Sequence, residues 1–342
     1  MGVTRGEAGS GFRKHQHMVN APKLLIKLLY LVKARTSELP RWSHRETKKV
    51  ARTPYNSVPL GRIARSDRKL VIFSAMKKPS PQWERLLKDV TGSLVLWRFW
   101  MHLGWGDVLK QYRRSFLGPV WLSLNTAIFI VVFALIGAQL FKMSLDTYLP
   151  YFCVGHVVFS FFSSLAQEGC QTYIGAESFL KQTPYPKTAF VWRVMWRNLI
   201  MFAHNLPVVL GVLWWGGAMG EARLEWLLAG LLLTVLAGAF LVAILGAISA
   251  RFRDVPMMVS SLMQISFFVT PVMWQPDQLT ERARLVVTWN PFAAFLDLLR
   301  RPLLGEVPET ATLYMACCVT VGLGVVFVLI YLGARRRIVY WL

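Results

Sequence analysis

Long apolar stretches separated by short polar segments fill the last two thirds of the chain. Each stretch has about 20 residues, the length that an α-helix needs to cross the hydrocarbon core of a bilayer. None of the six contains Asp, Glu, Lys or Arg; they cover residues 118–141, 149–167, 199–220, 226–250, 255–276 and 311–334. The pattern predicts an all-α integral membrane protein, with six transmembrane helices in a domain over residues 118–342.

An amphipathic segment precedes the first apolar stretch. Apolar side chains recur there at steps of three and four, at Leu94, Trp97, Met101, Trp105, Val108, Tyr112 and Phe116. A helix with Trp on one face and Lys or Arg on the other lies in the interface plane of a membrane. We expect a cytoplasmic interface helix within residues 76–117, where Gly104 and Gly106 permit a bend. This helix either only anchors the chain or also contacts a cytoplasmic partner.

The segment between the fifth and sixth apolar stretches, residues 277–310, is too short for a domain and too apolar for a free loop. Asn290-Pro291 is typical of a helix start, because Asn caps a helix and Pro fits its first position. We expect two short re-entrant helices that close or guide an exit path; a surface helical hairpin is the alternative. The candidate residues of this exit gate are Asn290, Pro291 and Phe292.

The charge distribution predicts the orientation in the membrane. The chain carries 39 Lys and Arg against 18 Asp and Glu, a net charge of +21, although only 17% of its residues are charged. This combination favours a membrane protein with basic loops over a soluble nucleic-acid-binding protein. With both termini in the cytoplasm, the inner segments carry 33 of the 39 basic residues. When the first 117 residues are left out, the inner segments still carry nine basic residues and the outer segments six.

The first 75 residues differ from the rest of the chain. They hold 16 basic and four acidic residues with scattered prolines and little periodicity. We expect a basic extension that is disordered, or that is mis-assigned because the biological start is Met76. The alternative is a tail that touches anionic lipid headgroups. Nothing in it offers a fold or a stacking platform for nucleic acid.

The sequence lacks the common motifs for nucleotide binding, metal binding and catalysis, and this excludes several classes of function. There is no phosphate-binding loop, no H-E-x-x-H motif, no acidic metal cluster and no G-x-S-x-G elbow. Only His156 and His204 can titrate within the six stretches, whereas ion-coupled carriers usually need an ionisable residue in the membrane. We therefore expect no catalysis, no metal site and no cofactor in this chain. If it moves a solute uphill, the energy comes from a partner.

Two predicted inner loops carry the remaining candidates. In residues 168–198, Phe179 and Tyr185 are apolar anchors for a partner, and Glu177 and Lys181 set its register. The alternative is an ordinary solvated turn. The second loop, residues 251–256, is either a site or only a basic stop after the fourth span. The complete candidate set for a partner interface is Glu177, Phe179, Leu180, Lys181, Tyr185 and Pro186, with Asp107 and Lys110 from the amphipathic segment.

Several segments, taken in order, resemble the membrane subunit of type-2 ABC exporters, in the branch that exports O-antigen, capsular or teichoic-acid polysaccharide. They are residues 112–121, 179–182 with Pro186, 194–200 with 203–205, 251–254, 270–272 and 289–292. The resemblance covers Met76 to Leu342, and residues 1–75 have no counterpart in it.

The resemblance implies a multi-pass protein of the bacterial inner membrane that works as a homodimer with two copies of a separate nucleotide-binding ABC subunit. That subunit would hold ATP and Mg, and the partner interface named above would couple its hydrolysis to transport. The implied substrate is a glycan on a polyprenyl diphosphate. Arginine suits phosphate oxygens, and the candidates for the diphosphate are Arg113, Arg114, Arg251 and Arg253.

We therefore expect a permease that exports lipid-linked polysaccharide from the cytoplasmic side to the outer side. Three alternatives stay open at this stage. One is a type-2 permease for a drug or another lipid, the second is a membrane glycosyltransferase or polymerase, and the third is a passive scaffold.

Overall fold

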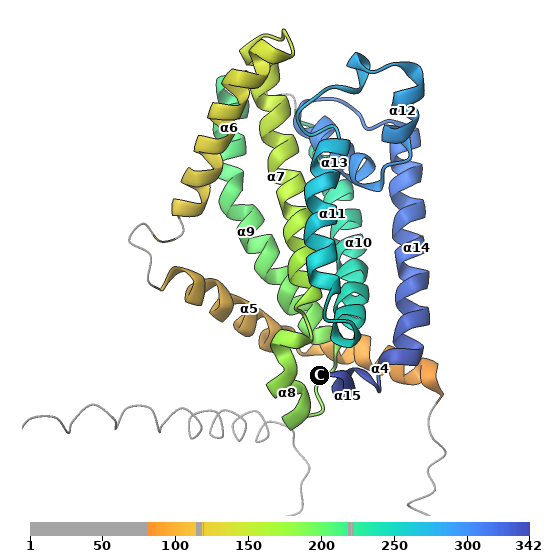
Figure 1. Cartoon of the computed structure of the whole chain (residues 1–342). Coiled ribbons are helices and arrows are strands. Elements are labelled where there is room, and N and C mark those ends of the chain that lie inside the picture. The colour runs from red at the N-terminus through yellow and green to blue at the C-terminus, as the bar shows by residue number, and fades with distance from the viewer. Residues whose placement is uncertain (1–80, 114–117, 119, 218–219, 221) are drawn as a thin grey trace, which may run out of the picture. The chain divides into compact units, whose positions relative to one another are not determined.

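The computed structural model describes residues 81–113, 118, 120–217, 220 and 222–342. All regular secondary structure in these ranges is helical, which confirms the all-α prediction for this part of the chain (Figure 1). The expectations for residues 1–75, for Arg114 and for Phe116 lie outside the described residues.

Five described helices are long and apolar enough to cross a membrane. They are α6 (Val120–Leu140), α7 (Leu145–Cys170), α9 (Thr188–Trp215), α10 (Leu224–Arg251) and α14 (Thr310–Ala334). They match the first four and the sixth of the predicted stretches. Pro150 and Pro207 lie inside α7 and α9 without ending them, as transmembrane helices allow.

The fifth predicted stretch, residues 255–276, forms a shorter helix than expected. Helix α11 (Val255–Val269) has 15 residues, which at 1.5 Å per residue gives about 22 Å against a bilayer core of about 30 Å. It ends before Pro271, because the residue that precedes a proline is disfavoured in the helical conformation. The described residues therefore contain five full-length apolar helices and one short one, and six full-length spans are not confirmed.

Helix α7 lies at the centre of the packing. It contacts α6, α9, α10, α11 and α13 (Pro291–Leu303), and most of its apolar window is buried. Small residues let α10 approach closely: a Cβ on Gly169 would lie 3.2 Å from Val242 Cα, and one on Gly238 would lie 3.0 Å from Leu165 Cδ1. Close backbone approach of this kind strengthens packing between helices in a membrane.

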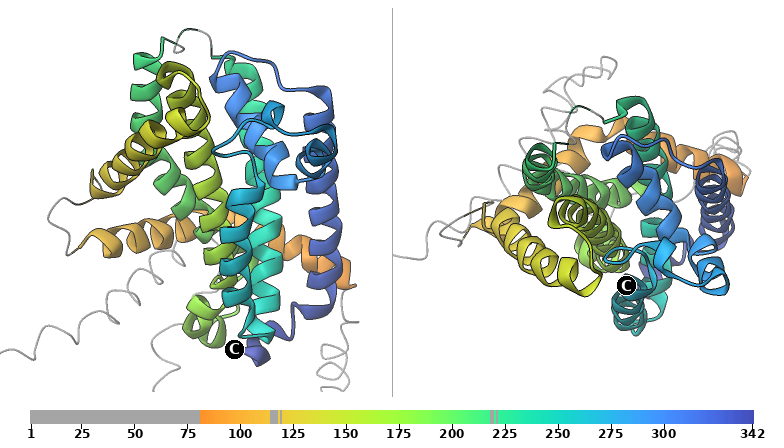
Figure 2. Two further views of the ribbon diagram at one scale, coloured as in Figure 1. Left: turned by 45° about the horizontal axis from the view of Figure 1, so that its top comes forward. Right: turned by 90° about the horizontal axis from the view of Figure 1, so that it is seen from above.

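The amphipathic segment forms two helices, α4 (Gln82–Val95) and α5 (Trp97–Tyr112), which run across one end of the long helices (Figure 1, Figure 2). The break falls at Leu96, and α5 continues through Gly104 and Gly106, so the permitted bend is not there. Gly104 instead allows close contact with α9, because a Cβ there would lie 3.0 Å from Trp196 Cδ1.

The predicted apolar face of this segment is only partly the face that packs on the protein. Val108 is buried against α9, but Leu94, Trp97 and Trp105 are about half exposed. The buried side of α5 runs through Gly104 and Val108, so the tryptophan side lies next to it and stays open. An open tryptophan face suits a helix at a membrane interface, a placement that stays a prediction.

Two short helices do lie between α11 and α14, as predicted: α12 (Glu281–Thr288) and α13, after the short 3-10 turn η3 (Pro276–Gln278). Asn290 caps α13, accepting a hydrogen bond of 2.9 Å from the backbone N–H of Phe292, and Pro291 is its first residue. This confirms the predicted helix start. Helix α13 packs against α7, α10 and α14, so it is more deeply enclosed than a surface hairpin.

The remaining short elements lie at the same end of the bundle as α4 and α5 (Figure 1). They are η1 (Ile174–Ala176), α8 (Glu177–Gln182) and the C-terminal α15 (Ile338–Trp341). Below, this end is called the α4–α5 end, and the opposite one the α12–α13 end. The described chain thus begins and finishes at one end of the bundle.

Candidate functional site

Helix α8 presents two charges outward from the α4–α5 end. The buried side chain of Leu180 fixes it to the core. Glu177 and Lys181 stand one turn apart on the open side, half exposed, with Lys181 Nζ 2.7 Å from Glu177 Oε1. The hydrogen bond from Lys181, aided by its charge, holds the pKa of Glu177 below its ordinary value. Helix α8 is therefore a small rigid knob with an ion pair on its surface.

The other predicted loop residues attach α8 to its neighbours. The Tyr185 ring stacks on Phe99 of α5 at 4.5 Å between centroids. Pro186 Cγ lies 3.3 Å from where a Cβ on Gly92 of α4 would be. Phe179 is half buried, with its ring 6.2 Å from that of Phe190. Tyr185 and Pro186 therefore join α8 to the α4–α5 pair, and Phe179 packs inward more than an anchor for a partner would.

Asp107 and Lys110 differ in what they face. Asp107 is only 11% exposed; its Oδ2 lies 2.6 Å from Arg193 Nε and 4.0 Å from an Arg197 nitrogen on α9. Burial raises its pKa, but the hydrogen bond and charge of Arg193, with those of Lys110 and Arg197, bring the pKa below the ordinary value. Asp107 thus holds α5 on α9, and Lys110, 76% exposed, is the one open to a partner.

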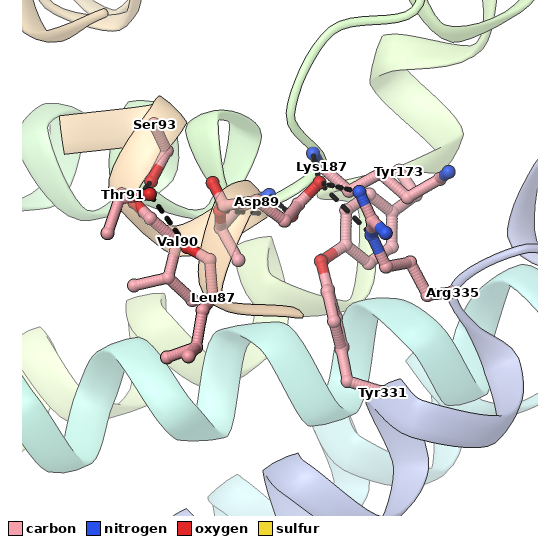
Figure 3. A network of polar contacts seen from close by, with 10 residues as sticks. Leu87, Asp89, Val90, Thr91, Ser93, Tyr173, Lys187, Tyr331 and Arg335 are labelled. Atoms are coloured by element: carbon pink, nitrogen blue, oxygen red, sulfur yellow. Dashed lines mark hydrogen bonds and ion pairs between the residues drawn. The ribbon is translucent and has the colours of Figure 1, made fainter. Parts of the chain in front are cut away.

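Asp89, which the sequence analysis did not single out, joins three elements at this end (Figure 3). It is 2% exposed on α4. Its carboxylate accepts hydrogen bonds of 3.1 Å from the backbone N–H groups of Lys187 and Thr188, and of 3.1 Å from the Thr188 hydroxyl. Arg335, just after α14, donates to the same carboxylate at 2.8 and 3.1 Å.

This arrangement gives α9 its N-terminal cap from another helix. The first N–H groups of a helix lack partners within it and favour a negative charge, and Asp89 supplies both the acceptor and the charge. The signal in the sequence was its spacing: Leu86, Asp89 and Ser93 are the buried residues of α4, three and four apart on one helix face.

A shallow cavity of about 320 Å³ opens beside α8 at the same end. Its walls are formed by α8, by the residues that follow α8, and by the C-terminal helix α15. Its lining residues are Leu180, Lys181, Gln182, Thr183, Pro184, Tyr185, Lys187 and Val339. The cavity is large enough to receive a side chain from a partner, and its only charged lining residues are Lys181 and Lys187.

The candidate diphosphate ligands do not come together in one place. Arg251 ends α10, with its guanidinium 5.8 Å from the Trp341 ring centroid, and Arg253 follows in the turn before α11. Both are exposed. Arg113 is exposed just after α5, whose end lies away from the α10–α11 turn (Figure 1, Figure 2). Within the described residues the turn therefore offers two arginines, not four.

An open groove of about 400 Å³ runs between α7 and α11. Hydroxyls, an amide and aromatic rings line it together: His156, Phe159, Ser160, Ser163, Ser164, Met263, Gln264, Phe267 and Phe268. His156 Nδ1 is buried without a hydrogen-bond partner. A bilayer offers no partners for such polar groups, so the polar part of this mainly apolar groove is suited to polar contents or a protein cover.

The predicted gate residues connect this groove to the segment between α11 and α14. Asn290 Nδ2 donates to Thr270 Oγ1 at 3.0 Å, at the point where α11 has just ended. The Phe292 ring packs edge-on to Phe159 and Phe162 of α7, at 6.2 and 6.3 Å. Pro291 is exposed. Asn290 and Phe292 thus fix the start of α13 to α11 and α7 beside the groove.

Among the described residues, no group of three or more His, Cys, Asp and Glu side chains is placed to hold a metal ion.

Comparison with known proteins supports a transport role. Residues 98–304, more than half of the chain, match the family model described as "ABC-2 type transporter". The chain is 27% identical over 195 residues to the O-antigen export system permease protein RfbA of Myxococcus xanthus, and 22% identical over 191 residues to the protein of that name from Klebsiella pneumoniae. Each match covers 56% of this chain and 74% of the relative.

Replacing Asp89 with Asn should destabilise the folded chain, because it breaks the buried ion pair with Arg335. Breaking a buried ion pair costs about 3–5 kcal/mol, and because Arg335 is 26% exposed we expect about 2–3 kcal/mol here. The midpoint of thermal unfolding of the purified chain measures this. Arg336→Gln, an exposed neighbour, is the matched control and should leave the midpoint unchanged. An Asp89→Asn chain that unfolds at the wild-type temperature would contradict the role of Asp89.

Proposed function

Because this chain belongs to the ABC-2 type transporter family, we propose that it is the membrane subunit of an ATP-driven exporter of polysaccharide. The groove between α7 and α11 is the observation that carries the proposal. Serine hydroxyls and Gln264 provide hydrogen bonds for sugar hydroxyls, and the phenylalanine rings provide faces for apolar sugar surfaces. A permease for an apolar drug or lipid would be served better by a wholly apolar groove. The two relatives, each described as an O-antigen export permease, support the same class.

A second copy of the chain is the proposed cover of the groove. The groove is open on one side, and polar groups facing lipid are unfavourable. Met257, Leu262 and Phe268 on α11 are exposed beside it, so the same face offers apolar surface for packing. Two grooves placed face to face would enclose one path, with α7 and α11 of each copy as its walls.

A separate nucleotide-binding subunit is the proposed source of energy, and the α8 knob is its docking point. The sequence contains no phosphate-binding loop, so ATP and Mg would be held by that subunit. A displacement of α8 passes to α5 through the stacked Tyr185 and Phe99 rings. It passes to α9 through the Asp89 cap at Lys187 and Thr188. The α4–α5 end would then face the cytoplasm.

The same orientation gives six crossings. Helix α11 starts at the α4–α5 end and runs toward the α12–α13 end (Figure 1), so α11 with the residues after it completes the crossing that its length alone does not. Both ends of the described chain then lie on the cytoplasmic side of the bacterial inner membrane. Arg251 and Arg253 stand just before α11 on the cytoplasmic side in this orientation, where a polyprenyl diphosphate carrying the glycan would meet them before it reaches the groove.

Removing the gene from its native host should abolish the surface polysaccharide. Polymer made in the cytoplasm would accumulate there on its lipid carrier, because the outward step is missing. Surface immunoblotting and extraction of lipid-linked glycan measure the two pools, and a plasmid copy of the wild-type gene should restore the surface pool. Unchanged surface polymer in the deletion strain would overturn the proposed function. Loss of polymer synthesis itself, with no accumulation inside, would favour the polymerase alternative.

Exchanging the two charges of α8 should uncouple the ATPase. The double change Glu177→Lys with Lys181→Glu keeps the ion pair and net charge but reverses the pattern shown to a partner. We expect normal amounts of chain in the membrane, with loss of surface polymer and of transport-linked ATP hydrolysis. The control is Glu225→Lys, an exposed carboxylate at the α12–α13 end, which should export normally. Normal export by the α8 double variant would refute the docking assignment.

Cross-linking of a cysteine introduced on α11 should detect the proposed second copy of the chain. In a background with the exposed Cys317 and Cys318 changed to Ser, Leu262→Cys on α11 should form covalent dimers with a bis-maleimide in membranes. Leu210→Cys on α9 is equally accessible in one copy, but α9 packs on another side of α7 (Figure 2), so it should stay monomeric. Dimers from Leu210→Cys alone would place the contact on the wrong face.

A further inference from the structure

An irregular, non-helical stretch lies beside α7 where α11 has ended. Residues Thr270 to Trp274 lead from α11 toward η3, and Val272 in their middle is fully buried. Backbone carbonyls left over by a broken helix need partners, and lipid offers none. The Thr270 carbonyl accepts from the Val272 N–H at 2.7 Å. The carbonyls of Pro271, Met273 and Trp274 accept from side chains of α7 and α13.

Two tyrosines of α7 donate to this stretch. The Tyr148 hydroxyl lies 2.8 Å from the Met273 carbonyl oxygen. The Tyr151 hydroxyl lies 3.0 Å from the Trp274 carbonyl oxygen and 3.3 Å from that of Pro271. Since the two tyrosines are three residues apart, they stand on one face of α7, directed at successive carbonyls of the stretch.

Arg300 of α13 is the third side chain that binds a carbonyl of this stretch, and it is buried although it is charged. It is 3% exposed, with Nη1 2.8 Å from the Pro271 carbonyl oxygen and Nη2 2.5 Å from Asp297 Oδ1. Its guanidinium lies 3.9 Å from the centroid of the Tyr151 ring. Charges enclosed among transmembrane helices are expensive and mark functional positions. A planar guanidinium makes all three contacts at once, which an ammonium does not.

Gly155 makes the close fit possible. A Cβ at this position of α7 would lie 3.0 Å from the Val272 carbonyl oxygen and 3.5 Å from Arg300 Nη1. The groove begins directly below: His156 and Phe159 on α7 line it, and Phe267 and Phe268 line it on α11, just before Thr270. The stretch held by Tyr148, Tyr151 and Arg300 therefore lies at the α12–α13 end of the groove.

We propose that Arg300 and Tyr151 form the latch of an outer gate. They hold residues Thr270 to Trp274 against α7 and keep the outer end of the groove closed while no polymer is moving. Both act through the backbone they hold, so they are positioning residues. The inference rests on the proposed function for the identity of the path, and it adds which contacts close that path.

The latch can be tested in cells that make no polymer, by measuring how fast a small solute leaks through the resting permease. The full chain is produced in bacteria that have cytosolic β-galactosidase but neither lactose permease nor an exported polysaccharide, and hydrolysis of added o-nitrophenyl galactoside reports permeability. A hydrogen bond to a charged group shifts a two-state equilibrium about tenfold or more. We therefore expect Arg300→Met to raise the leak about tenfold over wild type. Arg300→Lys, which keeps the charge without the planar contacts, should leak as well.

Arg301→Met is the matched control for the same helix and residue type. Arg301 is 30% exposed and pairs with the exposed Glu309 at 2.8 Å, so its loss should leave the leak at the wild-type level. Tyr151→Phe provides a second test, because it keeps the ring under Arg300 and removes only the hydroxyl. It should leak measurably at wild-type amounts of chain in the membrane.

The outcomes separate the latch from the proposed function. Wild-type tightness of Tyr151→Phe together with Arg300→Met, at normal membrane levels, would overturn the latch. If Arg300→Met fails to accumulate, Tyr151→Phe decides alone. Equal leakage of Arg301→Met would also overturn it, since the effect would not be specific to the buried contact. A deletion strain with normal surface polymer would sink the export proposal and leave the leak result to stand by itself.

Discussion

The Asp89 carboxylate is the interaction on which the α4–α5 end depends. One buried anion caps α9, neutralises Arg335 after α14 and anchors α4, three elements far apart in the sequence. A cap supplied by a neighbouring helix fixes the start of α9 to α4 more firmly than a local cap, because neither helix can shift without exposing N–H groups. Since α5 follows α4 after one residue, the interface helices and the long helices share this point.

Polar interactions concentrate at the two ends of the bundle, and apolar packing joins them. At the α4–α5 end, Glu168 of α7 pairs with Arg197 at 2.6 Å and accepts from Asn198 at 2.5 Å. At the α12–α13 end, Tyr148 and Tyr151 of the same helix hold the stretch after α11. Between them α7 is buried among apolar side chains. One helix therefore has a polar attachment at each end.

The sequence predicted those features that depend on neighbouring residues. Hydropathy located five long helices, and Asn290-Pro291 located the start of α13 because a cap is a local motif. The side of α5 that packs on α9 was not predicted, since Gly104 is buried by contact with Trp196 and not by its own hydropathy. The family resemblance was correct at the level of the ABC-2 type transporter family.

The sequence pattern could not predict which side chains from distant elements contact one another. Arg300 and Arg301 are adjacent and identical in type, and both fall in the segment between the fifth and sixth apolar stretches. The structure buries one against Tyr151 and exposes the other to Glu309. Likewise the sequence pattern predicted Asp107 for a partner interface, and the structure shows Arg193 binding it against α9. Helical periodicity predicts on which side of a helix a side chain lies. It does not predict which residue of another element contacts that side chain.

The position of α7 suggests how the two ends communicate. At the α4–α5 end, α7 is bonded to α9 through Glu168, and α9 begins at the Asp89 cap beside α8. At the α12–α13 end, α7 bears the tyrosines that hold residues Thr270 to Trp274. A packed helix transmits displacement as a unit because interiors are dense and deform little. A shift of α9 imposed at α8 would therefore move the tyrosines relative to the carbonyls they bind. The irregular stretch after the short α11 is the element able to yield.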